Sequence, residues 1–336
     1  MSKVSILGAG TWGCALAILL SDNGHDVTIW TKIEKEARTL KETRGNLKNL
    51  PGAKLPDNIK ISLDLKEACN GPEIIVMAVA SPYIRATAHE AGPFIREGQI
   101  LVNVSKGLED DTLKTLSDVI KEEIPQADIA VLSGPSHAEE VSRRIPTTIV
   151  VGAGSRETAK TIQDVFMNEV FRVYTSPDII GIELGASLKN VIALAAGVID
   201  GLGLGDNTKA ALMTRGMAEI SRLGMKMGGK LETFSGLSGM GDLFVTCTSL
   251  HSRNRKAGYL MGQGLTMEEA MKEVNQVVEG VNTAKAALHM AQKYEVEMPI
   301  VEQINMVLFE GKSPKEALAD LYGRDKRKEY KTLEWD

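Results

Sequence analysis

The stretch Lys3–Leu20 reads KVSILGAGTWGCALAILL and decides the class of fold. A short apolar run ends at the glycine motif Gly8-x-Gly10-x-x-Gly13, and an apolar segment of helical composition follows. In this context of strand, glycine turn and helix, the motif is typical of dinucleotide binding. Gly8 allows the tight turn, Gly10 lets the backbone approach a pyrophosphate, and Gly13 lets the helix sit close to the sheet. A glycine turn that merely packs is the alternative.

Further apolar runs of strand length alternate with amphipathic stretches through the first half of the chain. With the first strand included, the runs are Val4–Leu7, Val27–Trp30, Ile59–Ser62, Glu73–Val79, Ile100–Val104, Ile129–Leu132 and Thr147–Val151. Repeated strand and helix patterns, with strands that are apolar on both faces, indicate a parallel, doubly wound sheet.

Helix punctuation replaces the strand-like runs after about Ser176. Ser176 followed by Pro177 predicts an N-cap with proline at the first helical position. Two later pairs have the spacing of a capping box. These pairs are Thr266 with Glu269 and Ser313 with Glu316. The second half of the chain is therefore predicted to be all-helical.

Length and pattern together predict two domains in the 336 residues. Residues 1–180 are expected to form a Rossmann-type α/β domain around a doubly wound, mostly parallel sheet. Residues 181–336 are expected to form an all-helical C-terminal domain, joined to the first through the long helix that carries Lys189. Residues 43–57 are expected to form a loop, and the mixed charges of residues 323–336 indicate a solvated tail.

Composition excludes several classes of function. The net charge of −5 provides no overall basic field for nucleic acid or an anionic membrane. The three cysteines lack C-x-x-C spacing and the five histidines show no metal pairing, so neither disulfides nor a metal site is expected. The uncharged window Asn190–Ile199 is too short to span a bilayer, so no integral membrane segment is expected. A first strand that starts at once leaves no room for a signal peptide, which favours the cytoplasm.

The end of the second expected strand bears on the choice of nucleotide. Thr31 and Lys32 stand there, without a carboxylate at the tip, and Glu34 follows inside the next helix. An acid at this place would bind the ribose 2′-hydroxyl of NAD and repel a 2′-phosphate. Threonine and lysine leave NADP acceptable and somewhat favoured over NAD. A solvated surface lysine is the alternative explanation for Lys32.

Two segments at expected strand ends combine charge with glycine or hydroxyl residues. NVSKGLE places Lys106 beside Gly107, and LSGPSHAEEV supplies Gly134 and Ser136. Because ligands of open α/β sheets bind beyond the carboxyl ends of the strands, both segments are candidates for a ligand site. Ser136 and Glu139 also have capping-box spacing, which leaves a structural role open.

Two segments of the helical half complete the candidate site. SGLSGMGDLFVTC brings Asp242 and Thr246 to a glycine-rich turn and the start of a helix. HSRNRK places Ser252, Arg253 and Asn254 at an expected helix N-terminus. Backbone amides, a hydroxyl and a guanidinium together can clasp a phosphate. A solvated basic turn explains the second segment equally well.

Lys189 lies in an otherwise apolar stretch, GASLKNVIALAAGVI. Its neighbours at i±4 spacing are Gly181, Gly185, Ala193 and Gly197. This row leaves space for another backbone or for a small ligand. If another helix packs closely there, the lysine would snorkel outward to solvent. Alternatively, partial desolvation lowers the pKa of Lys189 and makes it a general base. A carboxylate such as Asp242 would raise that pKa again, so the net direction stays open.

In order and spacing, these motifs resemble those of the NAD(P)-dependent sn-glycerol-3-phosphate dehydrogenases of the bacterial cytoplasmic type. The resemblance covers essentially the whole chain, from GAGTWG through NVSKGLE, LSGPSHAEEV, GASLKNVIALAAGVIDGL and GMGDLFVT to SRNRK and VVEGVNTAKA. It implies that the helical domain holds the substrate and the catalytic lysine.

The resemblance also implies roles for individual residues. The nucleotide would contact Thr11, Trp12, Lys32, Lys106, Ala138, Arg253, Val277 and Glu279. The substrate would be bound by Lys106, Gly134, Ser136, Lys189, Asp242, Ser252, Arg253 and Asn254. The catalytic residues would be Lys189, Asp242, Lys106 and Thr246. Lys189 would be the proton acceptor, oriented by Asp242 and Thr246, and Lys106 would help to hold the substrate. Glu279 is equally explained as a helix-end residue before Gly280.

These roles imply an oxidoreductase that interconverts sn-glycerol 3-phosphate and dihydroxyacetone phosphate with NADP or NAD, and that supplies phospholipid synthesis. A dehydrogenase of another hydroxy substrate and a non-catalytic dinucleotide sensor are the alternatives. The sensor would leave Lys189 and Asp242 without a role. A homodimer is compatible with the sequence, which does not determine the oligomeric state.

Overall fold

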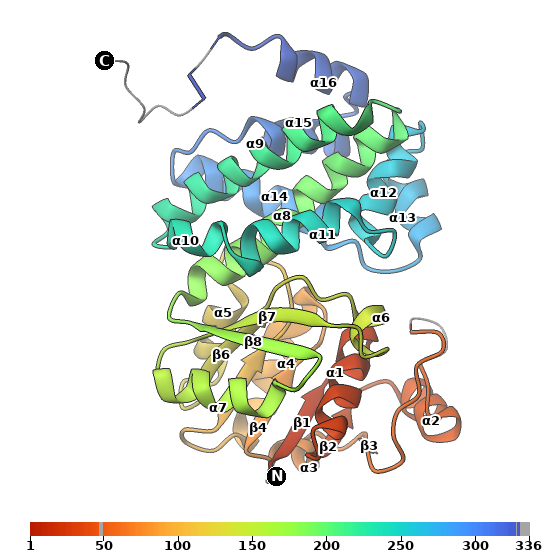
Figure 1. Ribbon diagram of the computed structural model, residues 1–336, viewed down its shortest axis with the longest axis vertical. Coiled ribbons are helices and arrows are strands. Elements are labelled where there is room, and N and C mark those ends of the chain that lie inside the picture. The colour runs from red at the N-terminus through yellow and green to blue at the C-terminus, as the bar shows by residue number, and fades with distance from the viewer. Residues whose placement is uncertain (47–49, 327, 330–336) are drawn as a thin grey trace.

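The computed structural model describes residues 1–46, 50–326 and 328–329. Figure 1 shows a sheet flanked by helices in the lower half and a layer of helices above it. In the expected loop at 43–57, the described residues form neither helix nor strand after Thr43. Most of the expected tail, 323–336, lies outside the described residues.

One sheet of eight strands organises the lower half, in the order β3-β2-β1-β4-β5-β6-β7-β8. The strands are β1 (Lys3–Leu7), β2 (Asp26–Trp30), β3 (Lys60–Ser62), β4 (Ile74–Met77), β5 (Ile100–Asn103), β6 (Asp128–Ser133), β7 (Thr147–Ala153) and β8 (Phe171–Ser176). All neighbours are parallel except β6 and β7, which are antiparallel. The prediction of a mostly parallel, doubly wound sheet is therefore confirmed.

Two features of the sheet escaped the sequence analysis. Strand β8 was not predicted because it lies at the edge of the sheet and alternates buried with exposed residues, so it leaves no continuous apolar run in the sequence. Strand β7 runs antiparallel to β6, and the short helix α6 (Ala138–Val141) lies in the connection between them.

Helices cover both faces of the sheet. They are α1 (Thr11–Asp22), α2 (Glu34–Thr43), α3 (Leu65–Cys69), η1 (Ser81–Tyr83), α4 (Ile84–Ala91), η2 (Gly92–Phe94), α5 (Leu116–Glu123), α6 and α7 (Arg156–Phe166). Successive strand residues point to opposite faces, so Ile6 packs in one apolar core with Leu16 while Leu7 packs in the other with Ile120. Two buried faces explain why the strands are apolar throughout.

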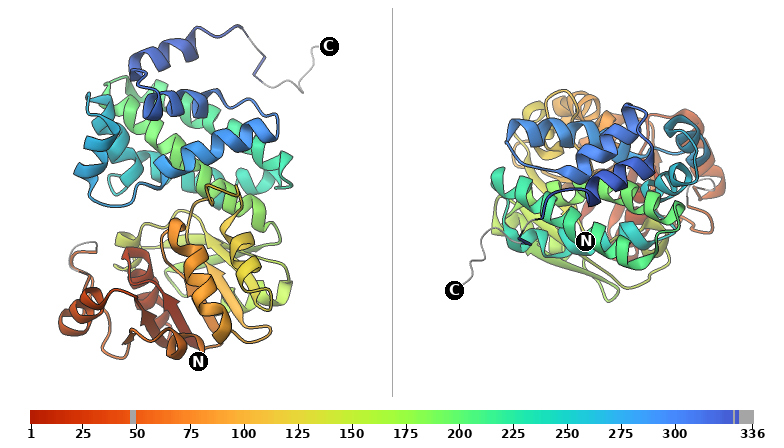
Figure 2. Two further views of the ribbon diagram at one scale, coloured as in Figure 1. Left: turned by 180° about the vertical axis from the view of Figure 1, so that it is seen from behind. Right: turned by 90° about the horizontal axis from the view of Figure 1, so that it is seen from above.

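The upper half is built around one central helix, α8 (Ile179–Gly201), whose residues 181–199 are all buried. The surrounding helices are α9 (Gly205–Lys226), α10 (Leu231–Phe234), η3 (Leu237–Gly241), α11 (Asp242–Thr248), α12 (Arg253–Gly262), α13 (Met267–Val274), α14 (Glu279–Lys293), α15 (Pro299–Phe309) and α16 (Pro314–Tyr322). The view from behind in Figure 2 shows the same stacking of the helical half on the sheet. The prediction of a helical second half is confirmed.

The start of α8 differs from the prediction. Asp178, not Ser176, caps the helix, because its carboxylate accepts from the Gly181 amide at 2.9 Å. The Ser176 hydroxyl instead accepts from the Asp178 amide at 3.1 Å. Both predicted capping boxes, at Thr266 and Ser313, are confirmed. The predicted domain boundary at residue 180 falls in the first turn of α8 and stays a prediction.

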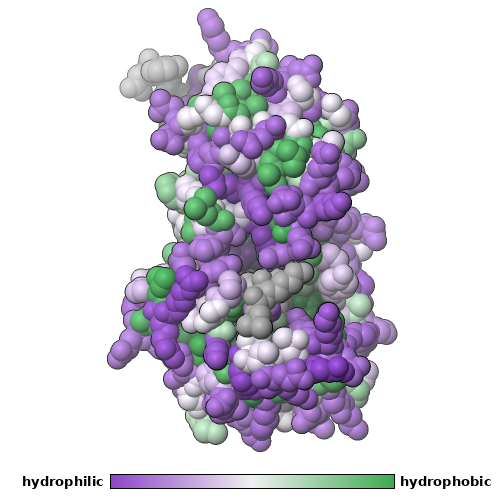
Figure 3. Space-filling model, turned by 90° about the vertical axis from the view of Figure 1, so that its right-hand side faces the viewer, coloured by the Kyte–Doolittle hydropathy of each residue, from purple (hydrophilic) through white to green (hydrophobic). Residues whose placement is uncertain are grey.

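Helix α8 is also the one described helix long and apolar enough to cross a membrane by length and composition alone. The uncharged window Asn190–Ile199 is shorter than this helix, so the length of the apolar segment was predicted too short. Most of its apolar window, 89%, is buried inside the protein. Packing against neighbouring helices therefore accounts for its apolar composition. The face drawn in Figure 3 is mostly hydrophilic, with apolar residues in small scattered groups.

Candidate active site

The glycine motif sits where β1 turns into α1. Gly8 has φ +121°, and a side chain there would meet the backbone of Ala78 at 2.7 Å. A side chain at Gly13 would lie 2.1 Å from the Gly8 carbonyl oxygen, so the helix packs directly on the turn. At Gly10, the N-cap of α1, a Cβ would meet no described atom within 4 Å. This open space at a helix N-terminus fits the pyrophosphate of a dinucleotide.

The end of β2 contradicts part of the sequence interpretation. The Thr31 hydroxyl donates to a carboxylate oxygen of Glu36, a residue of α2, so an acid does stand at this strand end. Lys32 is exposed and pairs with Glu90 of α4 at 2.6 Å. The sequence missed Glu36 because only the first turn of α2 folds it back to the strand. Thr11 and Trp12, at the start of α1, remain predicted nucleotide contacts.

The segment after β5 is held by α8. The Ser187 hydroxyl accepts from the Gly107 amide at 3.0 Å and donates to the Gly107 carbonyl oxygen at 2.9 Å. One turn earlier, the buried carboxylate of Glu183 accepts from the amide group of Asn103 at 3.1 Å. Lys106 therefore lies between two points at which this segment is anchored to the helix that carries Lys189.

Lys189, Asp242 and Lys106 form one centre at the junction of the two halves. The Lys189 ammonium donates to one oxygen of Asp242 and, at 2.6 Å, to the Thr246 hydroxyl. Lys106 donates to the other Asp242 oxygen at 2.8 Å and to the Gly134 carbonyl oxygen at 3.1 Å. We call these four side chains, Lys106, Lys189, Asp242 and Thr246, the lysine centre. All four were predicted from the sequence as catalytic residues, and the structure brings them together.

Burial dominates the electrostatics of the lysine centre. Lys189 is only 4% exposed, so it does not snorkel outward. Burial lowers the pKa of Lys189 to about 7, and the negative charge of Asp242 only partly counters it. Burial by itself raises the pKa of Asp242, but the charges of Lys106 and Lys189 outweigh burial and bring that pKa below its usual range. The carboxylate is thus ionised, and Lys189 exchanges its proton near neutral pH.

The glycine row beside Lys189 packs against other backbones. It does not form the space for a small ligand that the sequence also allowed. A side chain at Gly185 would lie 2.7 Å from the backbone oxygen of Ser238, and one at Gly197 would lie 2.1 Å from that of Arg255. These glycines therefore admit the backbones of η3 and α12 against α8. They leave no room there for a small substrate.

The segment after β6 carries the next predicted residues. Ser136 donates to the Gly134 carbonyl oxygen at 3.0 Å, and His137, not Ser136, is the N-cap residue of α6. The capping-box alternative for Ser136 and Glu139 is therefore wrong. Ala138 is buried in the first turn of α6. Gly134 has φ +142° and packs on Ile149, which only a residue without a side chain allows.

The predicted phosphate clasp lies at the start of α12. The Ser252 hydroxyl caps the helix by accepting from the Arg255 amide at 3.2 Å. Arg253 is exposed, and its charge acts on Glu279. Asn254 is buried, donates to Asn190 at 2.9 Å and accepts from the Gly280 amide at 2.8 Å. Asn254 thus ties α12 to α8 and α14, a structural role that the sequence did not indicate.

Two predicted nucleotide contacts come from the start of α14. Glu279 is its first residue, and its carboxylate accepts from the Ser81 hydroxyl of the sheet half at 2.6 Å. Val277 is 39% exposed just before the helix. Glu279 is therefore a helix-end residue and also links the two halves, and its contact with the nucleotide stays a prediction.

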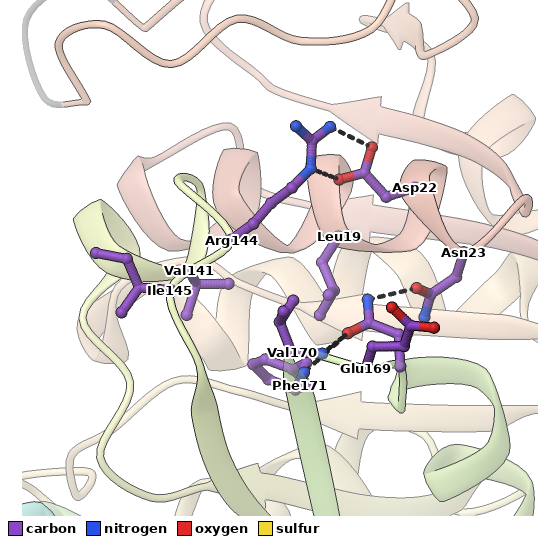
Figure 4. Close-up of a pocket in the computed structure, with 10 residues that line it drawn as sticks. Leu19, Asp22, Asn23, Val141, Arg144, Ile145, Glu169, Val170 and Phe171 are labelled. Carbon is purple, nitrogen blue, oxygen red and sulfur yellow. Dashed lines mark hydrogen bonds and ion pairs between the residues drawn. The ribbon is translucent and has the colours of Figure 1, made fainter.

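A separate pocket of about 280 Å³ lies on the sheet half, between the end of α1 and the start of β8 (Figure 4). Its charged pair, Asp22 and Arg144, is joined at 2.8 Å, and Asn168 donates to Asn23 at 2.7 Å. Its lining contains none of the predicted site residues. The pocket therefore lies apart from the candidate active site.

A glycine-lined helix N-terminus on a doubly wound sheet, next to a buried lysine with a pKa near neutrality, defines the class of dinucleotide-dependent dehydrogenases. Residues 3–159 match the family described as NAD-dependent glycerol-3-phosphate dehydrogenase N-terminus. Residues 178–319 match the family described as NAD-dependent glycerol-3-phosphate dehydrogenase C-terminus. The chain belongs to this family, which confirms the resemblance read from the motifs.

Individual relatives agree along the whole chain. A glycerol-3-phosphate dehydrogenase [NAD(P)+] of Agathobacter rectalis is 59% identical over 335 residues, which cover 100% of both chains. That of Bacillus subtilis is 50% identical and covers 99% of this chain and 97% of its own. The crystal structure of the Coxiella burnetii glycerol-3-phosphate dehydrogenase matches with a TM-score of 0.93 at 36% identity, over 96% of this chain and 99% of that one.

Proposed function

We propose that this chain interconverts sn-glycerol 3-phosphate and dihydroxyacetone phosphate with NAD or NADP. The observation that carries the proposal is the buried pair of Lys189 and Asp242 at the carboxyl ends of β5 and β6. Reversible oxidation of a secondary alcohol needs a group that both accepts and returns a proton. A lysine whose pKa is about 7 does both near neutral pH.

The side chains divide the work as follows. In the oxidising direction, neutral Lys189 accepts the proton of the C2 hydroxyl, and its ammonium form returns that proton during reduction. Asp242 and Thr246 hold the Lys189 nitrogen by hydrogen bonds, so its lone pair or proton points at one place. Lys106, anchored between Asp242 and Gly134, supplies a second positive charge toward the substrate oxygens. A nicotinamide held beside this centre would supply or take the hydride.

The substrate phosphate is assigned to the start of α12. The free amides of a helix N-terminus and the exposed Arg253 guanidinium attract a dianion there. Ser136 and Gly134, beside Lys106, would meet the other end of the substrate. The glycine turn at Gly10 would hold the dinucleotide pyrophosphate.

The predicted preference for NADP is weaker than the sequence alone indicated. Glu36 brings a carboxylate to the end of β2, and such a group favours the ribose 2′-hydroxyl of NAD. Lys32, the cation that would attract a 2′-phosphate, is paired with Glu90. Both nucleotides remain in the proposal.

An absorbance assay tests this function. The purified protein is mixed with dihydroxyacetone phosphate and with NADH or NADPH in parallel, and nicotinamide absorbance is followed. Loss of absorbance with this substrate, and a far smaller loss with unphosphorylated dihydroxyacetone, is expected. Nucleotide binding without turnover would support a sensor, and equal turnover of a 3-hydroxy acid with NAD would support another dehydrogenase.

Three further proposals rest on membership of the family. We assign the enzyme to the cytoplasm, its product to phospholipid synthesis, and its assembly to a homodimer. The described cysteines are all buried as free thiols, in keeping with a reducing compartment. Sedimentation equilibrium gives the assembly state, and a single species with the mass of one chain would overturn the homodimer.

A further inference from the structure

Three buried side-chain polar atoms lack a hydrogen-bond partner among the described residues: Arg44 Nε, Ser133 Oγ and His137 Nε2. Arg44 Nε still lies 3.7 Å from a carboxylate oxygen of Asp57. The other two bracket the short segment Gly134–Ser136, which the proposed function gives to the substrate. Buried polar atoms are nearly always paired, so this clustering calls for a partner that arrives with a ligand.

His137 lies within the electrostatic reach of the lysine centre. After burial, the charges of Lys189 and Lys106 are the largest influences that lower the pKa of His137, to about 4. Its imidazole is therefore neutral at neutral pH and carries one N–H donor and one acceptor nitrogen. A neutral ring can stand beside two lysines without repelling them.

His137 also touches the start of the helix that carries the proposed phosphate clasp. Its ring centroid lies 5.7 Å from that of His251, at an interplanar angle of 56°. His251 directly precedes Ser252, the N-cap of α12. The imidazole thus contacts the residue before the helix N-terminus and lies within the electrostatic reach of the lysine centre. A three-carbon phosphorylated substrate would bridge these two ends of the site.

We infer that His137 is a further substrate-binding residue, whose Nε2–H donates a hydrogen bond to a phosphate oxygen of the bound substrate. This inference rests on the proposed function and deepens it. The ligand class is a small phosphomonoester with a hydroxyl or carbonyl near its phosphate. Arg253 and the α12 amides contribute charge and dipole from one side, and His137 adds a directional donor from the sheet half.

Two substitutions of His137 and one control separate this role from a structural one. His137→Phe keeps a ring against His251 but removes both nitrogens, whereas His137→Gln restores an N–H at a similar reach. His251→Phe keeps the ring contact and removes nitrogens from the neighbouring residue only. We expect His137→Phe to raise the KM for dihydroxyacetone phosphate about tenfold to a hundredfold, the size of a lost hydrogen bond to a charged group. The KM for NADH should not change.

We would measure KM, kcat and the midpoint of thermal unfolding for each variant. We would also measure how strongly inorganic phosphate inhibits the enzyme in competition with dihydroxyacetone phosphate. His137→Gln should recover most of the lost affinity, and His251→Phe should behave like the wild type. Inorganic phosphate should inhibit His137→Phe at least tenfold more weakly than the wild type. Unchanged KM in His137→Phe would show that the orphaned nitrogen binds only water and would overturn the inference.

Other outcomes are equally decisive. Equal inhibition of all variants by inorganic phosphate, or none of the wild type, would overturn the assignment to the phosphate. Equal losses of NADH affinity and thermal stability in His137→Phe and His251→Phe would make the role structural and overturn it too. A wild type that never reduces dihydroxyacetone phosphate would instead contradict the proposed function, so the two failures are distinguishable.

Discussion

Two lysine–carboxylate pairs in this molecule have similar chemistry and different surroundings. Lys189 and Asp242 meet inside the junction of the two halves, where their side chains are 5% and 2% exposed. Lys32 and Glu90 meet at the end of β2, where their side chains are 70% and 43% exposed. In the first pair burial lowers the pKa of the lysine to about 7. Burial, more than pairing, therefore lets Lys189 exchange a proton near neutral pH.

The largest expected effect follows from removing the buried lysine. Lys189→Met should lower kcat about 10²–10⁴-fold, the usual contribution of general acid–base catalysis, while NADH binding is retained. Steady-state kinetics and nucleotide fluorescence measure the two properties. Lys209→Met is the matched control, because Lys209 pairs with Asp200 at 2.5 Å outside the lysine centre. Turnover near wild type in Lys189→Met would contradict the assignment.

The next test changes the charge around Lys189 and follows its titration. Oxidation of sn-glycerol 3-phosphate needs neutral Lys189, so kcat/KM should rise with pH through about 7, whereas reduction, which needs the ammonium, should fall. Asp242 raises the pKa of Lys189 and Lys106 lowers it. Asp242→Asn should therefore move the oxidation profile to lower pH, and Lys106→Met should move it to higher pH. Shifts in the same direction would exclude Lys189 as the titrating group.

A third buried ionisable group, Glu219, sharpens the comparison, because none of the lysines that the structure describes bonds to it. Glu219 of α9 is 2% exposed and accepts from the Ile300 amide at the start of α15 at 2.9 Å. Burial raises the pKa of Glu219 to about 7. Since folding favours the protonated form, the free energy of unfolding should fall as pH rises from about 4.5 through about 7.

Glu219→Gln should remove this fall by up to about 3 kcal/mol at pH 8 and change little at pH 4. Urea unfolding of both proteins at the two pH values measures the difference. Glu310→Gln, at the exposed C-terminal end of the neighbouring helix α15, controls for general charge effects. A variant less stable than wild type at pH 8 would show that the ionised carboxylate is the better partner of the helix N-terminus.

The smallest effects are expected at the exposed pair. Glu90→Gln should change the free energy of unfolding by less than about 1 kcal/mol, because water and salt screen surface ion pairs. Glu90→Gln also releases Lys32, so the KM for NADPH should fall relative to that for NADH. Glu36→Gln should change this ratio in the same direction, because it removes the carboxylate near Thr31. If the ratio of the KM for NADPH to the KM for NADH is unchanged in both variants, the end of β2 does not distinguish a 2′-phosphate from a 2′-hydroxyl.

Local patterns predicted much of this molecule. All seven strands that the sequence analysis named are present, because doubly buried strands leave continuous apolar runs. The capping boxes at Thr266 and Ser313 depend on residues three positions apart. Strand β8 and the Asp178 cap were missed, because an edge strand shows only alternation and a cap is chosen by competition among neighbouring polar residues.

The site follows the same division. The sequence predicted the glycine turn, because Gly8 and Gly13 act within one short segment. It also predicted the residue types that carry the chemistry, because Lys189 stands out as the one lysine in an apolar helix. The sequence did not predict three features of the site. These are the bond between Glu36 and Thr31, the anchoring of the Lys106 segment by α8, and the bonds by which Asn254 ties α12 to α8 and α14. Each depends on a side chain folding back to another element.

The sequence by itself thus determined the class of fold, the dinucleotide motif and the family, because these depend on periodicity and on motifs within short stretches. Only the tertiary structure decided that Lys189 is buried, that Asp242 lies between two lysines from positions 53 and 136 residues away, and that the glycine row receives helices instead of substrate. The physical reason is that desolvation and charge pairing depend on which segments, distant in the sequence, contact each other in the fold. Desolvation and nearby charges in turn determine the pKa of a side chain.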